Sequence, residues 1–489
     1  MLHKRGISVK NIKEECGVFG IYSPVKTDVA ATVYYGLYAL QHRGQESCGI
    51  VVNDDGVFTS CKDAGLVNEV FNHHDIAELG DGNMAIGHCR YGKAGENHML
   101  NAQPMVISHV KGNLALCFNG SLINGVETRE ALELSGSVFH TTSDAEIISN
   151  VIIRERLLAP SIEDSVSRAM DKLSGAYSIV IMSPRKLIAC RDIHGIRPLC
   201  YGQLKDGSYI IASESCAITS IGGTMIRDVR PGEIIVFDEN GVRSMADHVG
   251  EGKHALCVFE YLYTARPDSV IDGFSVNRAR VRAGRFLAIE HPVEADIVIG
   301  APDSGIDAAI GYAHESGIPY EMGFLKNKYI GRTFIAPGQS HREDLVRIKL
   351  NVITDVVRDK RVVLVDDSIV RGTTCARTIK LLREAGAKEV HMRSSAPPYI
   401  DLCYYGTDIG AKEDLIACRH SMEEIAEILN VDSLGYLNVD YLDKLADTTL
   451  DGFCKGCFTG EYPTRIPTVI RKNRYDKKIS DSAITRNEL

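Results

Sequence analysis

The sequence has no apolar stretch that approaches the ~20 residues needed to span a bilayer. Residues Met1–Glu15 lack the continuous apolar segment of a secretory signal. Basic residues are not in excess either, since 55 Lys and Arg stand against 64 Asp and Glu, a net charge of −9. This balance argues against a dedicated nucleic-acid-binding protein. We therefore expect a cytoplasmic protein with neither a membrane nor a nucleic acid as its partner.

The composition shows no bias toward a fibre or a disordered chain, because 44% hydrophobic and 24% charged residues are ordinary globular values. The 489 residues are enough for two large domains or three domains of about 150 residues. The fourteen cysteines lack the close, regular spacing of a small secreted disulfide scaffold. Nine are expected to be free, buried and apolar in role: Cys48, Cys61, Cys89, Cys117, Cys190, Cys200, Cys216, Cys375 and Cys418.

The first half of the chain alternates short apolar runs with Gly, Asn, Asp and Pro, a pattern typical of strands separated by turns. The predicted strands are Gly17–Tyr22, Gly49–Asn53, Met84–His88, Leu114–Asn119, Ala176–Met182, Lys186–Arg191 and Glu233–Asp238. The predicted helices are Asp28–His42, Asp144–Leu158 and Ile162–Leu173. In the first helix, apolar residues share one face and Asp28 can cap the N-terminus. The pattern predicts a sheet-rich, layered domain.

After about residue 250 the pattern changes to alternating strands and helices. Strands are predicted over Asp296–Gly300, Arg361–Val365 and Glu389–Ser394. Helices are predicted from about Ile306 and through Ala385, where Gly386 can end the helix. Such units imply a parallel sheet covered by helices. We place the domain boundary at the Gly-Glu-Gly sequence 250–252.

The segment Val362–Thr374, VVLVDDSIVRGTT, carries the strongest chemical signal. An apolar strand delivers Asp366 and Asp367 to its carboxyl end, where open α/β sheets bind ligands. The loop 368–374 then opens a helix whose free N–H groups and hydroxyls can hold a phosphate. Two carboxylates beside such a loop suit ribose hydroxyls or Mg²⁺, whereas a capped turn would need only one.

This pattern resembles the phosphoribosylpyrophosphate (PRPP) motif of type I phosphoribosyltransferases. The resemblance implies substrate-binding roles for loop and helix residues, namely Ser368, Arg371, Gly372, Thr373 and Thr374. A second strand–turn–helix at Asp303-Ser304-Gly305 is a plausible pyrophosphate loop. The basic stretch that follows it contains Lys326, Lys328, Arg332 and Arg342, with Lys326 and Arg332 the candidates for substrate binding. It suits either a cationic flap over the pyrophosphate or a solvated loop.

A second signal is Cys16, which directly precedes a Gly-containing strand. By itself such a cysteine is most often a core residue. Together with Gly36–Ser47 (LQHRGQES), Gly87–Tyr91, Asn119-Gly120 and Ser143-Asp144, it resembles the glutaminase domain of the N-terminal-nucleophile amidotransferases. That resemblance implies a four-layer αββα fold followed by the α/β phosphoribosyltransferase domain with its parallel sheet.

The resemblance also implies residue roles. Cys16 would be the nucleophile, with its own α-amino group as base once Met1–Glu15 is removed. Asn119 and the Gly120 amide would form the oxyanion hole. Arg90 would bind the glutamine α-carboxylate and Asp144 the α-ammonium group. The chain departs from the family in having Gly92-Lys93 where a Thr is usual, and the role of Lys93 is not given by the sequence.

Four further cysteines have specific contexts. Cys454 and Cys457 form a CxxC motif, which by itself fits a zinc half-site, a redox pair or no metal at all. With Cys257 and Cys403 they resemble the cluster ligands of iron–sulfur amidophosphoribosyltransferases. Four thiolates suit either a [4Fe–4S] cluster or Zn²⁺. The resemblance implies the cluster, in a structural or regulatory role.

The whole chain thus resembles the amidophosphoribosyltransferases, which use glutamine and PRPP to make 5-phosphoribosylamine in the first committed step of purine synthesis. The resemblance implies Mg²⁺ near Ser304, Asp366 and Asp367, inhibition by purine nucleotides and a homotetramer. It divides the chain into a propeptide, 1–15, a glutaminase domain, 16–250, and a phosphoribosyltransferase domain, 251–489. Alternatives are an amidotransferase with another acceptor and a PRPP-sensing regulator, while residues 1–15 are either a propeptide or a disordered extension.

Overall fold

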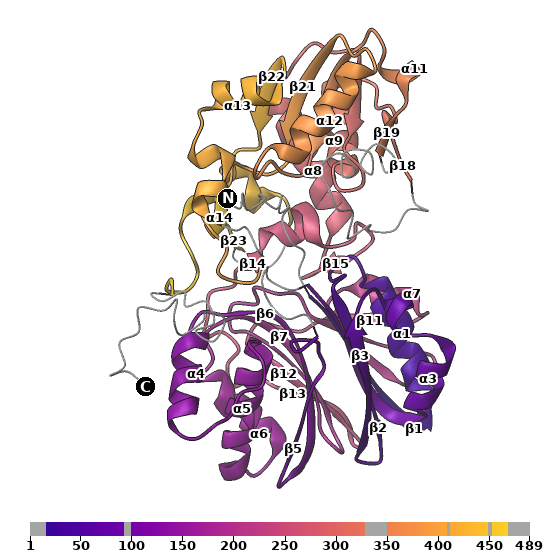
Figure 1. The fold of residues 1–489 in the computed structure, drawn as a ribbon, viewed down its shortest axis with the longest axis vertical. Helices are drawn as coiled ribbons and strands as arrows, with labels where there is room; N and C mark the ends of the chain where they lie inside the picture. Colours follow the sequence, from indigo (N-terminus) through magenta and orange to yellow (C-terminus); the bar gives the residue numbers. More distant parts are fainter. Residues whose placement is uncertain (1–15, 92–98, 328–349, 408–410, 448–451, 468–489) are drawn as a thin grey trace, which may run out of the picture.

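The computed structural model describes residues 16–91, 99–327, 350–407, 411–447 and 452–467. Two lobes are visible in Figure 1, with the elements of the first half of the chain in the lower lobe and those of the second half above it. Within the described ranges, no helix is both long and apolar enough to cross a membrane.

The lower lobe contains two antiparallel sheets. The first has seven strands in the order β11-β9-β10-β1-β4-β2-β3, and the second has six in the order β13-β12-β8-β7-β6-β5. The strands of the first sheet are β1 (Gly17–Thr27), β2 (Ser47–Asp54), β3 (Val57–Ala64), β4 (Gly82–Arg90), β9 (Cys200–Gln203), β10 (Tyr209–Ala212) and β11 (Thr224–Asp228). Those of the second are β5 (Met105–His109), β6 (Gly112–Leu122), β7 (Gly175–Met182), β8 (Leu187–Arg191), β12 (Ile234–Asp238) and β13 (Gly241–Met245).

The two sheets pack face to face, and helices cover both outer faces. Val18, Ile86, Val180 and Phe237 belong to the buried apolar layer between the sheets. The first sheet is covered by α1 (Val29–Ala39), α2 (Val67–Val70), α3 (His73–Leu79) and α7 (Ser215–Ser220), and the second by α4 (Gly125–Leu134), α5 (Asp144–Leu158) and α6 (Ile162–Met170). This arrangement, visible in Figure 1, confirms the predicted four-layer αββα domain.

Local chemistry explains where the predicted helices begin. The Asp28 carboxylate accepts a hydrogen bond from the backbone N–H of Ala31 at 2.9 Å, which satisfies one free donor of α1. The Ser143 hydroxyl accepts from the N–H of Ala145 and caps α5, whose bounds match the prediction. Strand pairing leaves His88 facing the second sheet, where its Nε2 lies 2.9 Å from the carbonyl oxygen of Phe118.

The upper lobe is built on a four-stranded parallel sheet in the order β17-β20-β21-β22. Its strands are β17 (Ile297–Gly300), β20 (Arg361–Asp366), β21 (Glu389–Ser394) and β22 (Ser433–Tyr436). Helices α8 (Val276–Glu290) and α9 (Ile306–Ser316) pack on one face, and α12 (Thr373–Glu384) and α13 (Met422–Leu429) on the other. The predicted α/β domain is therefore confirmed.

Short elements complete the upper lobe. The two-stranded pairs are β14 (Leu256–Cys257) with β23 (Phe453–Cys454), β15 (Val270–Ile271) with β16 (Phe274–Ser275), and β18 (Phe324–Lys326) with β19 (Leu350–Val352). The short helices are a π-helical turn, η1 (Glu260–Thr264), α11 (Thr354–Val357), α14 (Gly456–Thr459) and the 3₁₀ turns η2 (Lys412–Asp414), η3 (Ile416–Cys418) and η4 (Val439–Lys444).

Two cysteines depart from the expectation that nine of them are buried. Cys418 is exposed, with its Sγ 3.3 Å from the carbonyl oxygen of Ile400, because it lies at the end of a single 3₁₀ turn on the surface. Cys61, on edge strand β3, is only partly buried. The other seven are buried as predicted. The expected boundary at 250–252 falls between β13 and β14 and stays a prediction.

Candidate functional site

Cys16 directly precedes β1, beside the end of β4. Its Sγ lies 3.8 Å from the carbonyl oxygen of Tyr91, the residue after Arg90. Strand pairing brings these segments together, because Gly17 of β1 stands opposite Cys89 of β4. The side chain of Arg90 is almost completely buried. The sequence-predicted nucleophile and the predicted carboxylate-binding arginine thus lie at one end of the first sheet.

The predicted oxyanion residues lie on β6 of the second sheet. The contact between His88 and Phe118 links β4 to β6 one residue before Asn119, so the ends of the two strands approach each other. The Asn119 side chain is 1% exposed, and its Nδ2 has no hydrogen-bond partner among the residues that the structure describes. A buried amide donor without a partner carries a free-energy cost that a bound anion or carbonyl would remove.

Gly120 has a backbone conformation that favours glycine, with φ +139°. A Cβ at this position would collide with the carbonyl oxygen of Ala176 on β7. Asp144, at the start of α5, accepts a hydrogen bond from the N–H of Leu122 at 2.9 Å. The structure therefore places Asp144 beside the end of β6, the strand that carries Asn119 and Gly120.

A buried ionic cluster behind Cys16 has no predicted functional role. Arg43 donates from Nε to the carbonyl oxygen of Cys16 at 3.1 Å and from Nη1 to Glu214 at 2.6 Å. His42 Nε2 lies 2.7 Å from the same Glu214 oxygen. Burial acts to raise the pKa of Glu214, but His42 and Arg43 hold it well below its usual range. The LQHRGQES segment signalled these residues, but its pattern did not reveal their distant partners.

In the upper lobe, Asp366 is the last residue of β20 and Asp367 is the next, and Asp367 is hydrogen-bonded to the predicted pyrophosphate loop. Ser304 Oγ donates to Asp367 Oδ1 at 2.5 Å, and Ser368 Oγ donates to Asp367 Oδ2 at 2.6 Å. Burial and the neighbouring Asp367 charge raise the pKa of Asp366 well above its usual range. Hard carboxylate and hydroxyl oxygens of this kind fit Mg²⁺ or the hydroxyls of a sugar.

The phosphate-loop prediction coincides with the start of α12. Gly372 occupies the N-cap with φ +75°, and Thr373 and Thr374 are the first two residues of the helix, both exposed. Arg371 forms an ion pair with Asp414 at 3.2 Å. A helix start of this kind, with two exposed hydroxyls next to Asp366 and Asp367, can bind an anion.

Lys326, on β18, forms an ion pair with Asp303 of the candidate pyrophosphate loop. The structure thus places one predicted cation beside that loop. Arg332, Lys328 and Arg342 lie outside the described residues, as do Gly92-Lys93 and the predicted propeptide 1–15.

The four cysteines predicted as metal ligands line a single cavity. Cys257 and Cys454 are opposite each other in the parallel pair β14–β23, and Cys403 and Cys457 complete the set. Aromatic side chains close the cavity: Phe259, Tyr399, Tyr405 and Tyr462. Burial, then the neighbouring thiols, raises the pKa of Cys457 well above its usual range. Within the described ranges, no three His, Cys, Asp or Glu side chains converge as the ligands of a single metal ion.

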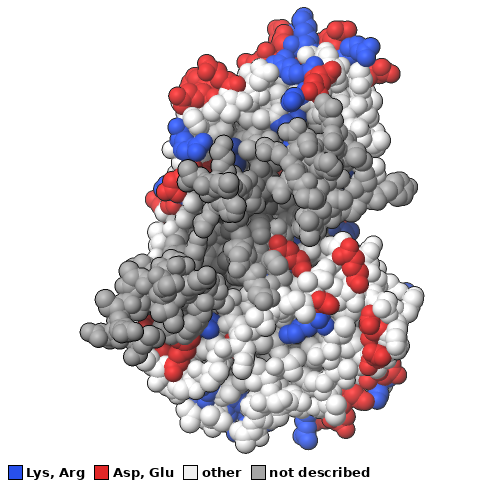
Figure 2. Space-filling view, viewed as in Figure 1, with Lys and Arg blue, Asp and Glu red and all other residues white. Residues whose placement is uncertain are grey.

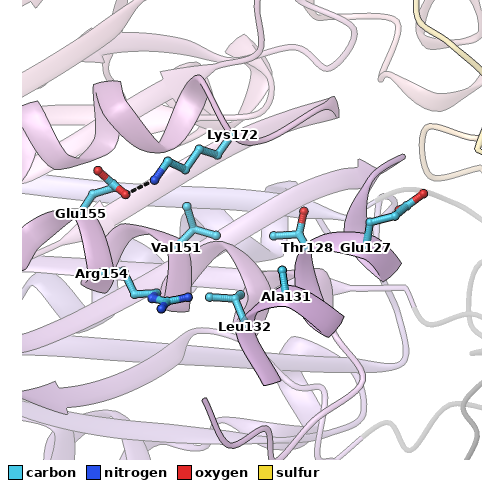
Figure 3. A pocket seen from close by; sticks show the side chains of 8 residues that line it. All are labelled: Glu127, Thr128, Ala131, Leu132, Val151, Arg154, Glu155 and Lys172. Atoms are coloured by element: carbon cyan, nitrogen blue, oxygen red, sulfur yellow. Dashed lines mark hydrogen bonds and ion pairs between the residues drawn. The ribbon is translucent and has the colours of Figure 1, made fainter. Parts of the chain in front are cut away.

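A separate surface hollow lies between α4 and α5 (Figure 3). It is lined by Leu132 and Val151 with Arg154, and its edge carries the ion pair between Glu155 and Lys172. None of the predicted site residues lines it. On the face seen in Figure 2, acidic and basic side chains are interspersed over the described parts of both lobes.

An αββα domain that begins beside a cysteine, joined to a parallel sheet with two aspartates at one strand end, is the architecture expected of a glutamine amidotransferase linked to a phosphoribosyltransferase. Comparison with known families agrees. Residues 94–220 match the model of a glutamine amidotransferase domain, and residues 277–396 match that of a phosphoribosyl transferase domain.

Known relatives then specify the family. The chain is 45% identical to the amidophosphoribosyltransferase of Bacillus subtilis, over 94% of this chain and 96% of that one. It is 46% identical to that of Archaeoglobus fulgidus, over 92% and 98%. A solved structure of the B. subtilis glutamine PRPP amidotransferase complexed with ADP and GMP is similar with a TM-score of 0.85 and 44% identity, covering 92% of this chain and 98% of that one. A structure described as the allosteric regulatory enzyme of purine biosynthesis gives 0.86 and 44%, covering 92% and 97%.

The chain belongs to the amidophosphoribosyltransferase family. It is an enzyme whose activity is that of an amidophosphoribosyltransferase, the first step of purine biosynthesis. The alternatives of a different acceptor and of a PRPP-sensing regulator are therefore set aside, because the similarity extends over both domains.

Proposed function

We propose that Cys16 is the nucleophile that attacks the side-chain amide of glutamine in the first half-reaction. In this proposal, residues 1–15 are a propeptide whose removal exposes the α-amino group of Cys16 as general base for the thiol. The amine takes the thiol proton, sulfur bonds to the amide carbon, and the leaving nitrogen departs as ammonia. Water then releases glutamate from the thioester. The position of Cys16 beside Tyr91 at the end of β4 supports this role.

We further propose that Asn119 and the Gly120 amide stabilise the negative oxygen that forms during this attack. The observation that carries the proposal is the buried Asn119 Nδ2, which lacks a hydrogen-bond partner among the described residues. An amide donor held ready for charge that develops in the transition state needs no reorganisation when the reaction occurs. Arg90, at the end of β4, and Asp144, at the start of α5, would hold the α-carboxylate and α-ammonium groups of glutamine.

For the second half-reaction, we propose that PRPP binds at the carboxyl end of the parallel sheet. The loop residues Ser368, Arg371, Gly372, Thr373 and Thr374 would hold a phosphate, while Lys326 and Arg332 would face the pyrophosphate. Ser304, Asp366 and Asp367 would lie near Mg²⁺, which when bound neutralises the charge of the leaving group. Ammonia nitrogen bonds to C1 as the bond from C1 to the pyrophosphate oxygen breaks, and the products are 5-phosphoribosylamine and pyrophosphate.

We propose that Cys257, Cys403, Cys454 and Cys457 hold a [4Fe–4S] cluster in a structural or regulatory role. Four thiols that line one cavity suit such a cluster, which takes one thiolate per iron. Anaerobically purified protein should contain iron and acid-labile sulfide in equal amounts, whereas zinc without sulfide would contradict this.

Several whole-protein properties belong to the same proposal. The B. subtilis relative was solved with ADP and GMP, which supports purine nucleotides as inhibitors of this chain. The homotetramer, the cytoplasmic location and the division into 1–15, 16–250 and 251–489 also remain proposals. The position of 250–252 between β13 and β14 supports the last of these.

The first experiment measures glutamate release from glutamine by the anaerobically purified enzyme, with and without PRPP and Mg²⁺. We expect a large PRPP-dependent increase with matching pyrophosphate, because the two half-reactions belong to one enzyme. The Cys16→Ala variant should lose glutamine-dependent synthesis and retain synthesis from ammonia. The reciprocal variant Asp367→Asn should lose synthesis from both nitrogen sources and retain slow glutamine hydrolysis. If a folded Cys16→Ala variant lost both activities, the two-site assignment would be wrong.

A further inference from the structure

A buried ionic network crosses from the glutaminase domain to the phosphoribosyltransferase domain. Its centre is Glu260, in the π-helical turn η1 of the second domain, and its side chain is 0% exposed. Arg43 of the first domain donates to both carboxylate oxygens of Glu260, at 2.7 and 3.0 Å. Arg197, also of the first domain and also fully buried, lies with Nη1 3.6 Å from Glu260. One carboxylate of the second domain therefore faces two arginines of the first.

The first arginine holds the backbone of the nucleophile. The Nε of Arg43 donates to the carbonyl oxygen of Cys16 at 3.1 Å, while its other nitrogens are held by Glu260 and Glu214. Once residues 1–15 are removed, Cys16 is attached to the chain on one side only. A chain terminus is poorly ordered unless other groups tie it down. The orientation of the Arg43 guanidinium therefore determines where the Cys16 carbonyl, and with it the thiol, is placed.

The second arginine holds a loop that packs against the proposed oxyanion strand. Arg197 donates from Nε and Nη2 to the carbonyl oxygen of Tyr405, at 3.1 and 2.7 Å. The next residue, Gly406, approaches Gly120 so closely that a Cβ on Gly406 would lie 3.4 Å from the carbonyl carbon and oxygen of Gly120. The Tyr405–Gly406 backbone of the second domain thus supports the strand that carries Asn119 and Gly120.

The element that carries Glu260 is itself fixed. Arg280 of α8 donates to the carbonyl oxygens of Tyr261, Tyr263 and Ala265 at 2.7 to 2.8 Å, which satisfies three acceptors at the end of the π-helical turn. Glu260 is therefore held on a rigid part of the second domain.

We propose that Glu260 is a positioning residue for glutamine hydrolysis: it aligns the Cys16 nucleophile, through Arg43, with the Gly120 oxyanion strand, through Arg197 and Tyr405. This inference rests on the proposed roles of Cys16 and Gly120. Attack on an amide requires the sulfur and the oxyanion donors to hold their geometry together, and small misplacements reduce the rate strongly. The glutaminase site is then complete only when the second domain is docked.

The test uses Glu260→Gln in the full holoenzyme. The substitution keeps the size of the side chain and removes the charge that faces Arg43 and Arg197. We expect the kcat for glutamine-dependent synthesis to fall at least about tenfold, the KM for glutamine to stay within about twofold, and ammonia-dependent synthesis to remain within about twofold of the parent. Alkylation of Cys16 by a glutamine-like electrophile should slow in parallel, and Glu260→Asp should recover part of the kcat.

The matched control is Asp272→Asn. Asp272 accepts from Nη1 and Nη2 of Arg191 at 2.7 and 2.9 Å, which is another buried pair between the two domains. Among the described residues, the Asp272 side chain makes no hydrogen bond with Cys16 or the Tyr405 loop, and its partner Arg191 reaches the network only through the backbone carbonyl of Arg197, at 2.7 Å. This variant should keep the parental ratio of glutamine- to ammonia-dependent synthesis. An unchanged kcat for glutamine in Glu260→Gln, or the same selective loss in Asp272→Asn, would overturn the inference.

Two further comparisons distinguish a failure of this inference from a failure of the proposed function. If Glu260→Gln does not fold, Arg197→Lys keeps the charge and removes the paired donation to Tyr405, and it should show the same selective loss of kcat; a parental kcat would overturn the inference. If Cys16→Ala loses glutamine-dependent synthesis while Glu260→Gln keeps it, only the inference fails. If Cys16→Ala keeps it, the proposed nucleophile itself is wrong.

Discussion

At the scale of a single residue, the proposed oxyanion donor Asn119 carries a folding cost that its proposed role would explain. Its side-chain amide is buried on β6, and among the described residues its Nδ2 has no partner. Leaving such a donor unsatisfied costs about 1–3 kcal/mol of folding free energy. A hydrogen bond from this donor to bound substrate would explain why the protein tolerates that cost.

We expect Asn119→Ala to lower the kcat of glutamine-dependent synthesis about 10²- to 10³-fold, because one oxyanion donor is lost. The KM for glutamine and the ammonia-dependent rate should change little. Steady-state kinetics with both nitrogen sources would measure this. Asn53→Ala is the control, since its buried amide donates to the carbonyl oxygens of Ser183 and Pro184 away from Cys16. Equal losses in both variants would assign Asn119 a purely structural role.

The candidate residues themselves could be named from the sequence because each lies in a local pattern. Asp366 ends an apolar strand, Asp367 directly follows it, and Cys16 directly precedes another strand. The ionic network could not be predicted in this way. Arg43 and Glu260 are 217 positions apart, and their pairing depends on how two separately patterned domains dock. A local sequence pattern does not indicate a contact between residues so far apart in the chain.

At the scale of helices and strands, the sequence predicts the elements that have a clear cap or a clear apolar pattern and does not predict those that lack one. Helix α5 has a serine cap and a long apolar face, and its predicted bounds match the structure. Strand β3, Val57–Ala64, was missed because it is an edge strand with mostly exposed or half-buried side chains and few apolar residues. Strands β9 to β11 are only four or five residues long, too short for a clear alternation.

Helix α12 permits a test of the phosphate loop. Gly372, at its N-cap, has φ +75°, and a Cβ there would lie 2.8 Å from Cδ1 of Ile416. We expect Gly372→Ala to destabilise the protein by about 1–3 kcal/mol through backbone strain and to raise the KM for PRPP at least several-fold. Thermal unfolding and PRPP titrations of pyrophosphate release measure the two effects.

The matched control stands at the other end of the same helix. Gly386 has φ +94°, and a Cβ there would lie 3.4 Å from Cγ of Arg358, a flexible side chain. Gly386→Ala should therefore share the loss of stability but leave the KM for PRPP unchanged. A raised KM in both variants would show that strain in the helix, and not the loop itself, affects the substrate.

At the scale of the whole molecule, a carboxyl group between the domains links stability to pH. Asp228, at the end of β11, accepts from the N–H of Gly273 at 3.2 Å and lies near Arg191 and Asp272. Burial and the charge of Asp272 raise the pKa of Asp228 to about 7, against the opposing effect of Arg191 and the backbone donors. Below that pH the folded protein holds a proton that the unfolded chain releases above about 3.8.

The stability contributed by this group therefore falls as the pH rises from about 4 to 7. We expect Asp228→Asn to raise the thermal midpoint at pH 8 by about 2–4 °C, corresponding to about 1 kcal/mol, and to raise it less at pH 5.5. Anaerobic thermal unfolding at both pH values measures this, with the surface variant Asp206→Asn as control. A gain that is larger at pH 5.5 would contradict the assignment.

Tyr405 and Gly406 lie far from Cys16 along the chain, and this separation has a consequence while the protein is being translated. The last strand of the αββα domain, β13, ends at Met245, but Tyr405 and Gly406 leave the ribosome about 160 residues later. At translation rates of about 5–20 residues per second, the interval is about 8–30 s. During this time a nascent chain contains Cys16, the proposed nucleophile, but not the Tyr405–Gly406 backbone that packs against the proposed oxyanion strand. Growing polysomes would then consume little glutamine, and ammonia production would begin only when an acceptor site exists on the same chain.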